Sequence, residues 1–135
     1  MPFMVWNDKL SVGVKLIDND HKKLLGMANH LYDAIAAQRG KQELERILSE
    51  LVEYTTFHFA REEELFSRTG YPEAARHKIE HDELTTQVLR IQARYHGGSQ
   101  ALTLEVMIFL KDWLFDHILG SDVRFGPHFN AKGVQ

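Results

Sequence analysis

Hydrophobic positions recur at spacings of three and four residues over most of this chain, and this periodicity predicts amphipathic helices. The first such stretch covers residues 19–38, and its apolar positions are Leu24, Leu25, Ala28, Leu31, Tyr32 and Ile35. Three further stretches with the same periodicity cover residues 41–68, 72–95 and 100–118. We therefore expect four long helices.

Turn-forming residues mark the expected ends of the first three helices. Asp18 or Asn19 can cap the start of the first helix, and Gly40 can end it. Gly70 suits the end of the second helix, and Pro72 suits the first turn of the third. These residues agree with the boundaries that the hydrophobic periodicity predicts.

The connections between the four stretches are short. The segment "HGGS" at residues 96–99 is expected to stop the third helix, and Gly120 is expected to stop the fourth. Short connections make neighbouring helices antiparallel. The predicted fold class is therefore all-α, an up-down-up-down antiparallel four-helix bundle over residues 19–122.

The two ends of the chain lack this long periodicity. Residues 1–18 are expected to form an extended arm along the bundle, and residues 123–135 an irregular tail. The apolar residues of the arm are Val5, Trp6, Val12 and Val14. With 135 residues and no internal repeat, the chain is expected to form one domain.

Composition excludes several classes of site and partner. The net charge is -3 and basic residues form no run or stripe, so nucleic acid is not an expected partner. The absence of cysteine excludes disulfides, thiolate zinc sites and cysteine-ligated iron–sulfur clusters. The first residues contain no long apolar run, so we expect neither a signal peptide nor membrane insertion. The expected location is therefore the cytoplasm.

The composition also contains eight histidines, an unusually large number, and their helical angles separate them into two groups. Because a helix turns about 100° per residue, residues four apart share a face. In the segment "HFAREEELF", His58 continues an apolar line and Glu62 lies four residues later. Glu63 and Glu64 are rotated by about 140° and 120° from His58, and we expect them, with Arg61, on the solvated surface.

Four more histidines continue the apolar face of their helices. His77 and His81 are four apart on the third helix, His21 begins the first, and His117 ends the fourth. In an antiparallel bundle all of these positions lie at the same end as the pair on the second helix. The other three histidines are expected on the surface, in a turn or in the tail, and they are His30, His96 and His128.

A lone histidine on an apolar face is usually a hydrogen-bonded core residue. Five histidines and a glutamate in one layer would instead leave many buried polar atoms competing for partners. Metal ions resolve this conflict, because neutral imidazole nitrogens and carboxylate oxygens are both good ligands. The ligands are too many for one tetrahedral zinc, so the pattern favours two metals.

Two adjacent cations favour carboxylates that bridge them, and a second acid is therefore of interest. Asp122 lies five residues beyond His117, which on a continuous α-helix is a rotation of about 140°. We hypothesise that Gly120 breaks the helix and lets Asp122 fold back over the end of the bundle. The alternative is an aspartate in a solvated loop.

The spacing of these residues resembles the hemerythrin family, most closely its single-domain bacterial members. The supporting stretches are "WNDKLSVGVKLIDNDHKKL", "HFAREEELF", "GYPEAARHKIEH" and "DWLFDHILGSD", and the resemblance extends over nearly the whole chain, from Trp6 to about Asp122. One departure is Asp20, where the family often has glutamine, and we expect this flanking difference to matter little.

This resemblance implies two non-haem iron ions joined by an oxo or hydroxo bridge. One iron would be held by His77, His81 and His117, and the other by His21 and His58. Glu62 and Asp122 would bridge both. The second iron then has one ligand fewer, and dioxygen would bind at this open position. The candidate residues for an apolar oxygen pocket are Leu24, Phe59, Trp113, Leu114 and Ile118.

The implied function is reversible binding of dioxygen for its carriage, storage or delivery, rather than an enzymatic activity. The pocket positions include no acid or hydroxyl that could protonate bound oxygen, and this favours binding over activation. The alternatives are a di-iron enzyme (a peroxidase, an oxidase or a nitric oxide reductase) and an oxygen sensor with a separate partner. We expect a monomer, with an oxygen-consuming enzyme as a candidate recipient.

Overall fold

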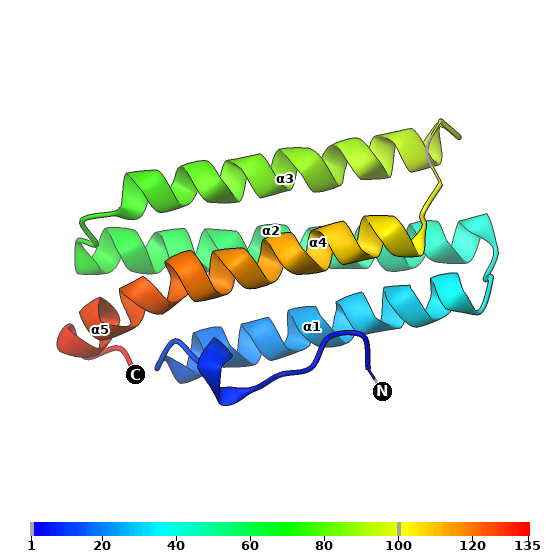
Figure 1. Cartoon of the computed structure of the whole chain (residues 1–135). Coiled ribbons are helices and arrows are strands. Elements are labelled where there is room, and N and C mark those ends of the chain that lie inside the picture. Colours follow the sequence, from blue (N-terminus) through cyan, green and yellow to red (C-terminus); the bar gives the residue numbers. More distant parts are fainter. Residues whose placement is uncertain (1, 100) are drawn as a thin grey trace.

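The computed structural model describes residues 2–99 and 101–135, and its main elements are four long helices (Figure 1). Their bounds are Lys15–Ala36 for α1, Lys41–Thr69 for α2, Ala74–His96 for α3 and Leu104–His117 for α4. Successive helices run in opposite directions, and the described part of the chain contains no strand. The predicted all-α, up-down-up-down four-helix bundle is confirmed.

The helix ends agree with the predicted turn residues only in part, because α1 already ends at Ala36, Gly40 is the N-cap of α2, and Pro72 precedes α3. Gly70 ends α2 in the left-handed conformation, with φ 67°, and its N–H donates to the carbonyl of Phe66. The side chain of Thr103 caps α4 by accepting a hydrogen bond from the N–H of Val106. Residue 100, the predicted start of this helix, lies outside the described residues, and α4 begins only at Leu104.

The predicted N-terminal arm is present, but it is shorter than residues 1–18 and is interrupted by a turn. A 3₁₀ turn, η1, covers Asp8–Leu10, and α1 begins at Lys15. Asp18 lies inside α1 and does not cap it. Its carboxylate instead accepts hydrogen bonds from the N–H of Val12 (2.8 Å) and the hydroxyl of Ser11 (2.5 Å). Asp18 therefore fastens the arm to the bundle, a role that helical periodicity cannot reveal.

The prediction of an irregular tail is also wrong. Gly120 does not end the helix, because α4 continues through a π-helical turn, η2 at Ile118–Asp122, into α5 at Val123–Ala131. Phe125 and Phe129, four residues apart on α5, are completely buried. The tail is helical because these two rings share one face and close the end of the core.

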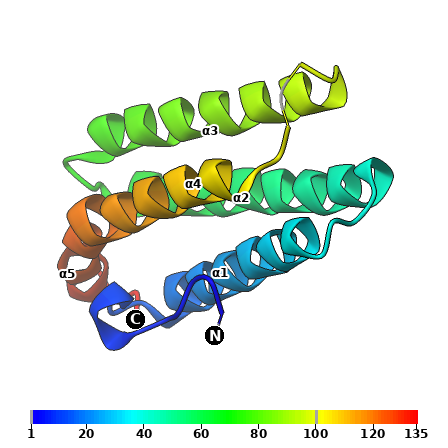
Figure 2. The same ribbon diagram turned by 45° about the vertical axis from the view of Figure 1, so that its right-hand side comes forward.

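The arm and α5 meet at the end of the bundle, and both ribbon views show η1 beside the C-terminal segment (Figure 2). Val12, Phe66, Phe125 and Phe129 belong to one hydrophobic cluster there. Gly126 is packed so closely that a Cβ atom on it would lie 1.9 Å from the carbonyl oxygen of Val12. Only glycine allows this approach of the two backbones.

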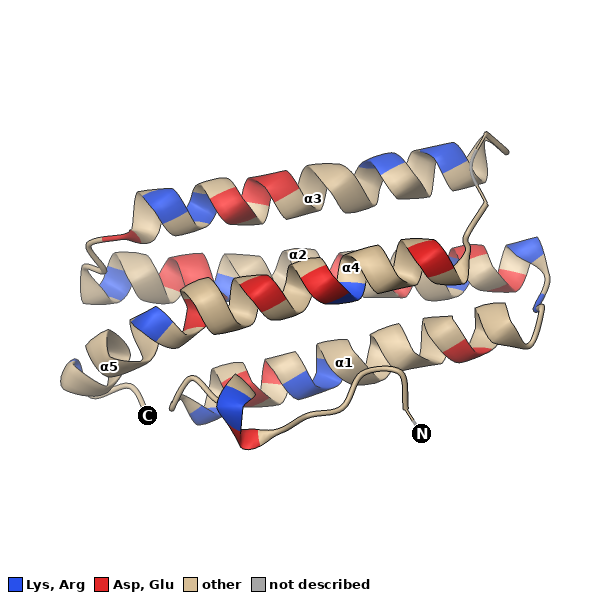
Figure 3. Ribbon diagram, viewed as in Figure 1, with Lys and Arg blue, Asp and Glu red and all other residues tan. Residues whose placement is uncertain are grey.

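The outer faces of the helices carry charged residues together with some exposed apolar side chains, among them Phe57, Ile79 and Phe109. Acidic and basic residues are interspersed over all four of them, as Figure 3 shows. In the described part of the chain, none of the helices combines the length and the apolar character that spanning a bilayer requires. The larger core cluster between the helices is formed by their buried apolar side chains, and it includes Leu24, Leu31, Leu48 and Met107.

Candidate metal centre

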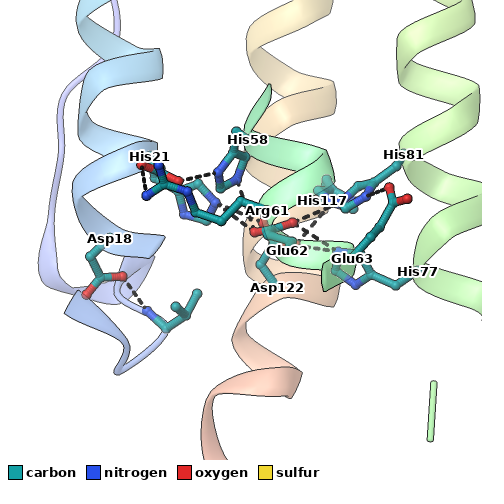
Figure 4. A network of polar contacts seen from close by, with 12 residues as sticks. Asp18, His21, His58, Arg61, Glu62, Glu63, His77, His81, His117 and Asp122 are labelled. Carbon is teal, nitrogen blue, oxygen red and sulfur yellow. Dashed lines mark hydrogen bonds and ion pairs between the residues drawn. The ribbon is translucent and has the colours of Figure 1, made fainter. Parts of the chain in front are cut away.

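Seven polar side chains meet inside the bundle, at the end that α5 covers (Figure 4). Each is at most 5% exposed, and they are His21, His58, Glu62, His77, His81, His117 and Asp122. They come from α1, α2, α3, α4 and the π-helical turn η2. The structure thus brings together every residue that the sequence singles out as a metal ligand.

Glu62 lies between two groups of histidines. One of its oxygens, Oε2, is 3.0 Å from Nε2 of His58 and 3.5 Å from Nε2 of His21. The other, Oε1, is 2.9 Å from Nε2 of His81 and 3.6 Å from Nε2 of His77. The carboxylate therefore offers one oxygen to each group, which is the arrangement that a bridging ligand needs.

Asp122 completes the same arrangement from the end of the bundle. Its Oδ1 is 2.9 Å from Nε2 of His77 and 3.1 Å from Nε2 of His117, and its Oδ2 is 3.2 Å from Nε2 of His21. The hypothesis that Gly120 breaks the helix is wrong, but Asp122 does reach the site. In a π-turn the hydrogen bonds join residues five apart, so Asp122 comes into register with His117.

The buried atoms of this cluster fit metal ions better than they fit one another. In the described residues, Nε2 of all five histidines, both oxygens of Glu62 and Oδ1 of Asp122 are buried without a hydrogen-bond partner. Two such groups of donor atoms form, one from His77, His81, His117 and Asp122, the other from His21, His58 and Glu62. Imidazole nitrogens and carboxylate oxygens without sulfur suit borderline divalent metals such as iron.

Electrostatics of the metal-free cluster point to the same conclusion. Burial disfavours a charged imidazole, but the carboxylates of Asp122 and Glu62 outweigh it and raise the pKa of His21 and His77 to about 9. Burial also lowers the pKa of His58, but the carboxylates of Glu62 and Asp20 outweigh burial and raise this pKa to about 10. Burial raises the pKa of the Glu62 carboxyl, but the histidines hold it well below its usual range. The two buried carboxylates therefore favour positive charge beside them, at His21, His58 and His77.

Asp20 is a buried residue behind the cluster whose contact with a histidine sequence reasoning missed. It is only 5% exposed, and its Oδ2 lies 2.9 Å from Nδ1 of His58. Its Oδ1 accepts a hydrogen bond from the hydroxyl of Tyr54 (2.9 Å) and lies 3.4 Å from Nη1 of Arg61. A hydrogen bond to Nδ1 leaves Nε2 of His58 free to bind metal. The sequence treated Asp20 only as a flanking position and gave no sign of this contact with His58.

Glu63 was also assigned to the solvated surface, and this expectation is wrong. Its Oε2 lies 2.9 Å from Nδ1 of His81, and the side chain is 29% exposed. On α3, Glu80 approaches Nδ1 of His117 at 3.5 Å and accepts a hydrogen bond from Ser121. The sequence shows no signal for these pairs, because each joins residues on different helices.

An apolar cavity of about 60 Å³ adjoins the cluster on its inner side. Leu24, Phe59 and Leu114, three of the five candidate pocket residues, line it. The ring of Phe59 stacks on that of His81, with centroids 3.9 Å apart, and lies 5.9 Å from that of His58. Phe59 is therefore a wall shared by the cavity and the histidines of both groups.

The other two candidate pocket residues do not line this cavity. Trp113 stacks on the ring of His117 at 5.2 Å, and Ile118 is completely buried in the larger core cluster. The histidines expected outside the site lie outside it, since His30 and His96 are exposed and His128 contacts the carbonyl oxygen of Thr69. The helical angles thus sorted the histidines correctly.

Comparison with known proteins gives the family. A model of the family described as "Hemerythrin HHE cation binding domain" matches residues 12–129. The chain is 34% identical to a bacteriohemerythrin of Stenotrophomonas maltophilia over 97% of this chain and 84% of that protein. It is 37% identical to a bacteriohemerythrin of Pseudomonas aeruginosa over 93% of this chain and 80% of that protein.

A solved structure agrees with these sequence matches. The crystal structure of a wild-type hemerythrin superposes with a TM-score of 0.88 at 32% identity, covering 93% of this chain and 96% of that one. The family match spans the last residues of the arm, the four helices and most of α5, and it includes every buried histidine and carboxylate described above. The chain belongs to the hemerythrin family.

Proposed function

We propose that this protein binds dioxygen reversibly at a non-haem di-iron centre. In this proposal His77, His81 and His117 hold one iron, and His21 and His58 hold the other. Glu62 and Asp122 bridge the two, together with an oxo or hydroxo group. Two separate groups of donor atoms with a carboxylate oxygen for each support a pair of metals rather than one.

The unequal number of histidines supports an open position on one iron. Three histidines surround the oxygens on one side, and only two do so on the other. When bound, two ferrous ions can together supply the electrons that reversible oxygen binding requires. The residues of the chain then have to orient the ligand, exclude water and withhold protons.

The lining of the cavity supports oxygen binding over catalysis, because it offers few groups that could protonate bound oxygen. Among the described residues that line it, Thr55 carries the one hydroxyl, and this hydroxyl donates to the carbonyl of Leu51 at 2.8 Å. The one charged residue of this described lining is Lys111, whose ammonium group lies 4.9 Å from the ring centre of Phe3. The described lining contains no carboxylic acid and no histidine, and its apolar side chains, such as Leu24, would shield a bound oxygen species from water.

A metal analysis and a visible spectrum test this proposal. The purified protein should contain two irons per chain. The reduced protein, mixed with air, should form a coloured adduct that persists and is lost reversibly under argon. Zinc or manganese in place of iron would contradict the di-iron assignment. Rapid conversion to the ferric form with release of hydrogen peroxide, or sustained turnover, would favour a peroxidase, oxidase or nitric oxide reductase instead.

We further propose how the protein works in the cell. As a cytoplasmic monomer it would carry or store dioxygen and deliver it to an oxygen-consuming enzyme. Sedimentation of the iron-loaded protein tests the monomeric state. A signalling protein that is retained by the oxygenated form and not by the deoxygenated form would point to a sensor instead.

A further inference from the structure

The two groups of histidines differ in the carboxylates behind them. Asp20 contacts Nδ1 of His58 with a side chain that is 7% exposed. On the other side, Glu63 contacts His81 at the same distance of 2.9 Å, but its side chain is 29% exposed. Water screens an exposed charge more than a buried one. Glu80, behind His117, is 31% exposed, so the most buried of these outer carboxylates faces the group that contains His58.

The hydrogen bonds of Asp20 define how this charge is divided. Oδ2 serves His58 alone, whereas Oδ1 accepts from Tyr54 and faces Arg61. A carboxylate behind a ligating histidine raises the basicity of the imidazole, and Nε2 then donates more electron density to its metal. Donors to Oδ1 withdraw part of this charge. In this network the charge of Asp20 increases the basicity of His58, and Tyr54 and Arg61 limit that increase.

We propose that Asp20 is a positioning residue that lowers the reduction potential of the iron held by His21 and His58. This inference rests on the proposed function, because it concerns the iron with the open position. A more electron-rich ferrous ion at this position gives up electrons to dioxygen more readily. Asp20 therefore strengthens oxygen binding, and Tyr54 sets an upper limit to this effect.

Two substitutions of nearly equal shape should act in opposite directions. Asp20→Asn removes the charge but keeps an oxygen for Nδ1 of His58, so the reduction potential should rise. Tyr54→Phe removes a donor to Oδ1 and leaves more charge for His58, so the potential should fall. Outer ligand changes typically alter metal sites about 10-fold to 100-fold, and a tenfold change in a one-electron equilibrium is about 59 mV.

The test is an anaerobic spectroelectrochemical titration of the iron-loaded protein. We expect a rise of about 59 mV or more for Asp20→Asn, and a smaller fall for Tyr54→Phe. Glu63→Gln is the matched control, because it removes a carboxylate at the same distance from a histidine but at a more exposed position. Its shift should be smaller than that of Asp20→Asn. The oxygen dissociation rate should increase in Asp20→Asn.

If the substitutions act by loosening the site and not by changing its charge, the reduction potentials of Asp20→Asn and Tyr54→Phe should shift in the same direction. That result would overturn the proposal. An unchanged potential in Asp20→Asn with two irons retained would overturn it as well. If Asp20→Asn loses its iron, Tyr54→Phe decides, since a rise or no change there contradicts the proposal. A wild-type protein without two irons, or without a reversible oxygen adduct, refutes the proposed function itself.

Discussion

Gly126→Ala tests the contact between α5 and the arm, which closes the end of the bundle over the metal centre. A Cβ atom at this position would lie 1.9 Å from the carbonyl oxygen of Val12, whereas ordinary contacts begin at 3.4 Å. The two backbones would have to separate by about 1.5 Å, the difference between these distances. That shift would also strain the hydrogen bond from Asn130 to the carbonyl of Gly13.

The expected cost follows from two opposing effects. Alanine is favoured over glycine inside a helix by about 1 kcal/mol. Overpacking typically costs about 1–3 kcal/mol, and we expect the upper end of that range or more because both partners are backbone. The net loss in the free energy of unfolding is then about 2 kcal/mol. For a domain of this size it lowers the melting temperature by roughly 5–10 °C.

Gly26→Ala is the matched control, because Gly26 lies on the exposed face of α1 and a Cβ there meets nothing within 4 Å. This variant should be more stable than the wild type by up to about 1 kcal/mol. Thermal unfolding followed by circular dichroism at 222 nm measures both. Because α5 directly follows Asp122, Gly126→Ala should also hold iron less tightly. A Gly126→Ala protein as stable as the Gly26→Ala protein would refute the reasoning.

Two further predictions concern the metal ligands. His77→Ala should lose iron, because its Nε2 faces both Glu62 and Asp122, whereas His30→Ala, on the exposed face of α1, should keep two irons per chain; equal iron content in the two would contradict the ligand assignment. In the iron-free protein the pKa is raised to about 9 for His77 and to about 10 for His58. The native state therefore binds more protons than the unfolded chain between about pH 6.5 and 10, and its melting temperature should fall as the pH rises through this window. The melting temperature of the iron-loaded protein should not fall in this way, and calorimetry of both forms between pH 6 and 10 tests the prediction.

Helical periodicity predicted most of the ligand set. His58 and Glu62, or His77 and His81, share a face whenever the segment is an α-helix, and the same angles placed His30 correctly on the surface. The antiparallel order of the helices then brings the inward residues to one end. These inferences need only local structure and short connections, and both can be predicted from sequence.

Asp122 shows where periodicity fails. On an α-helix it would point away from His117, and the hypothesis of a helix break was wrong in its geometry. A π-turn is energetically less favourable than an α-turn and persists when tertiary contacts support it. Here Phe125 and Phe129 are fully buried against Phe66, and they hold the continuing helix in place. The sequence alone shows no distinct signal for this turn.

The sequence by itself determined the four helices, the inward face of each and the residue types that gather at one end, because these depend on contacts within a few residues. The tertiary structure decided which side chains stand behind the ligands, as Asp20 and Glu63 do for His58 and His81. It also decided that the tail folds into α5 and closes the centre. Such contacts join residues far apart in the chain, and their geometry is fixed only when the helices pack.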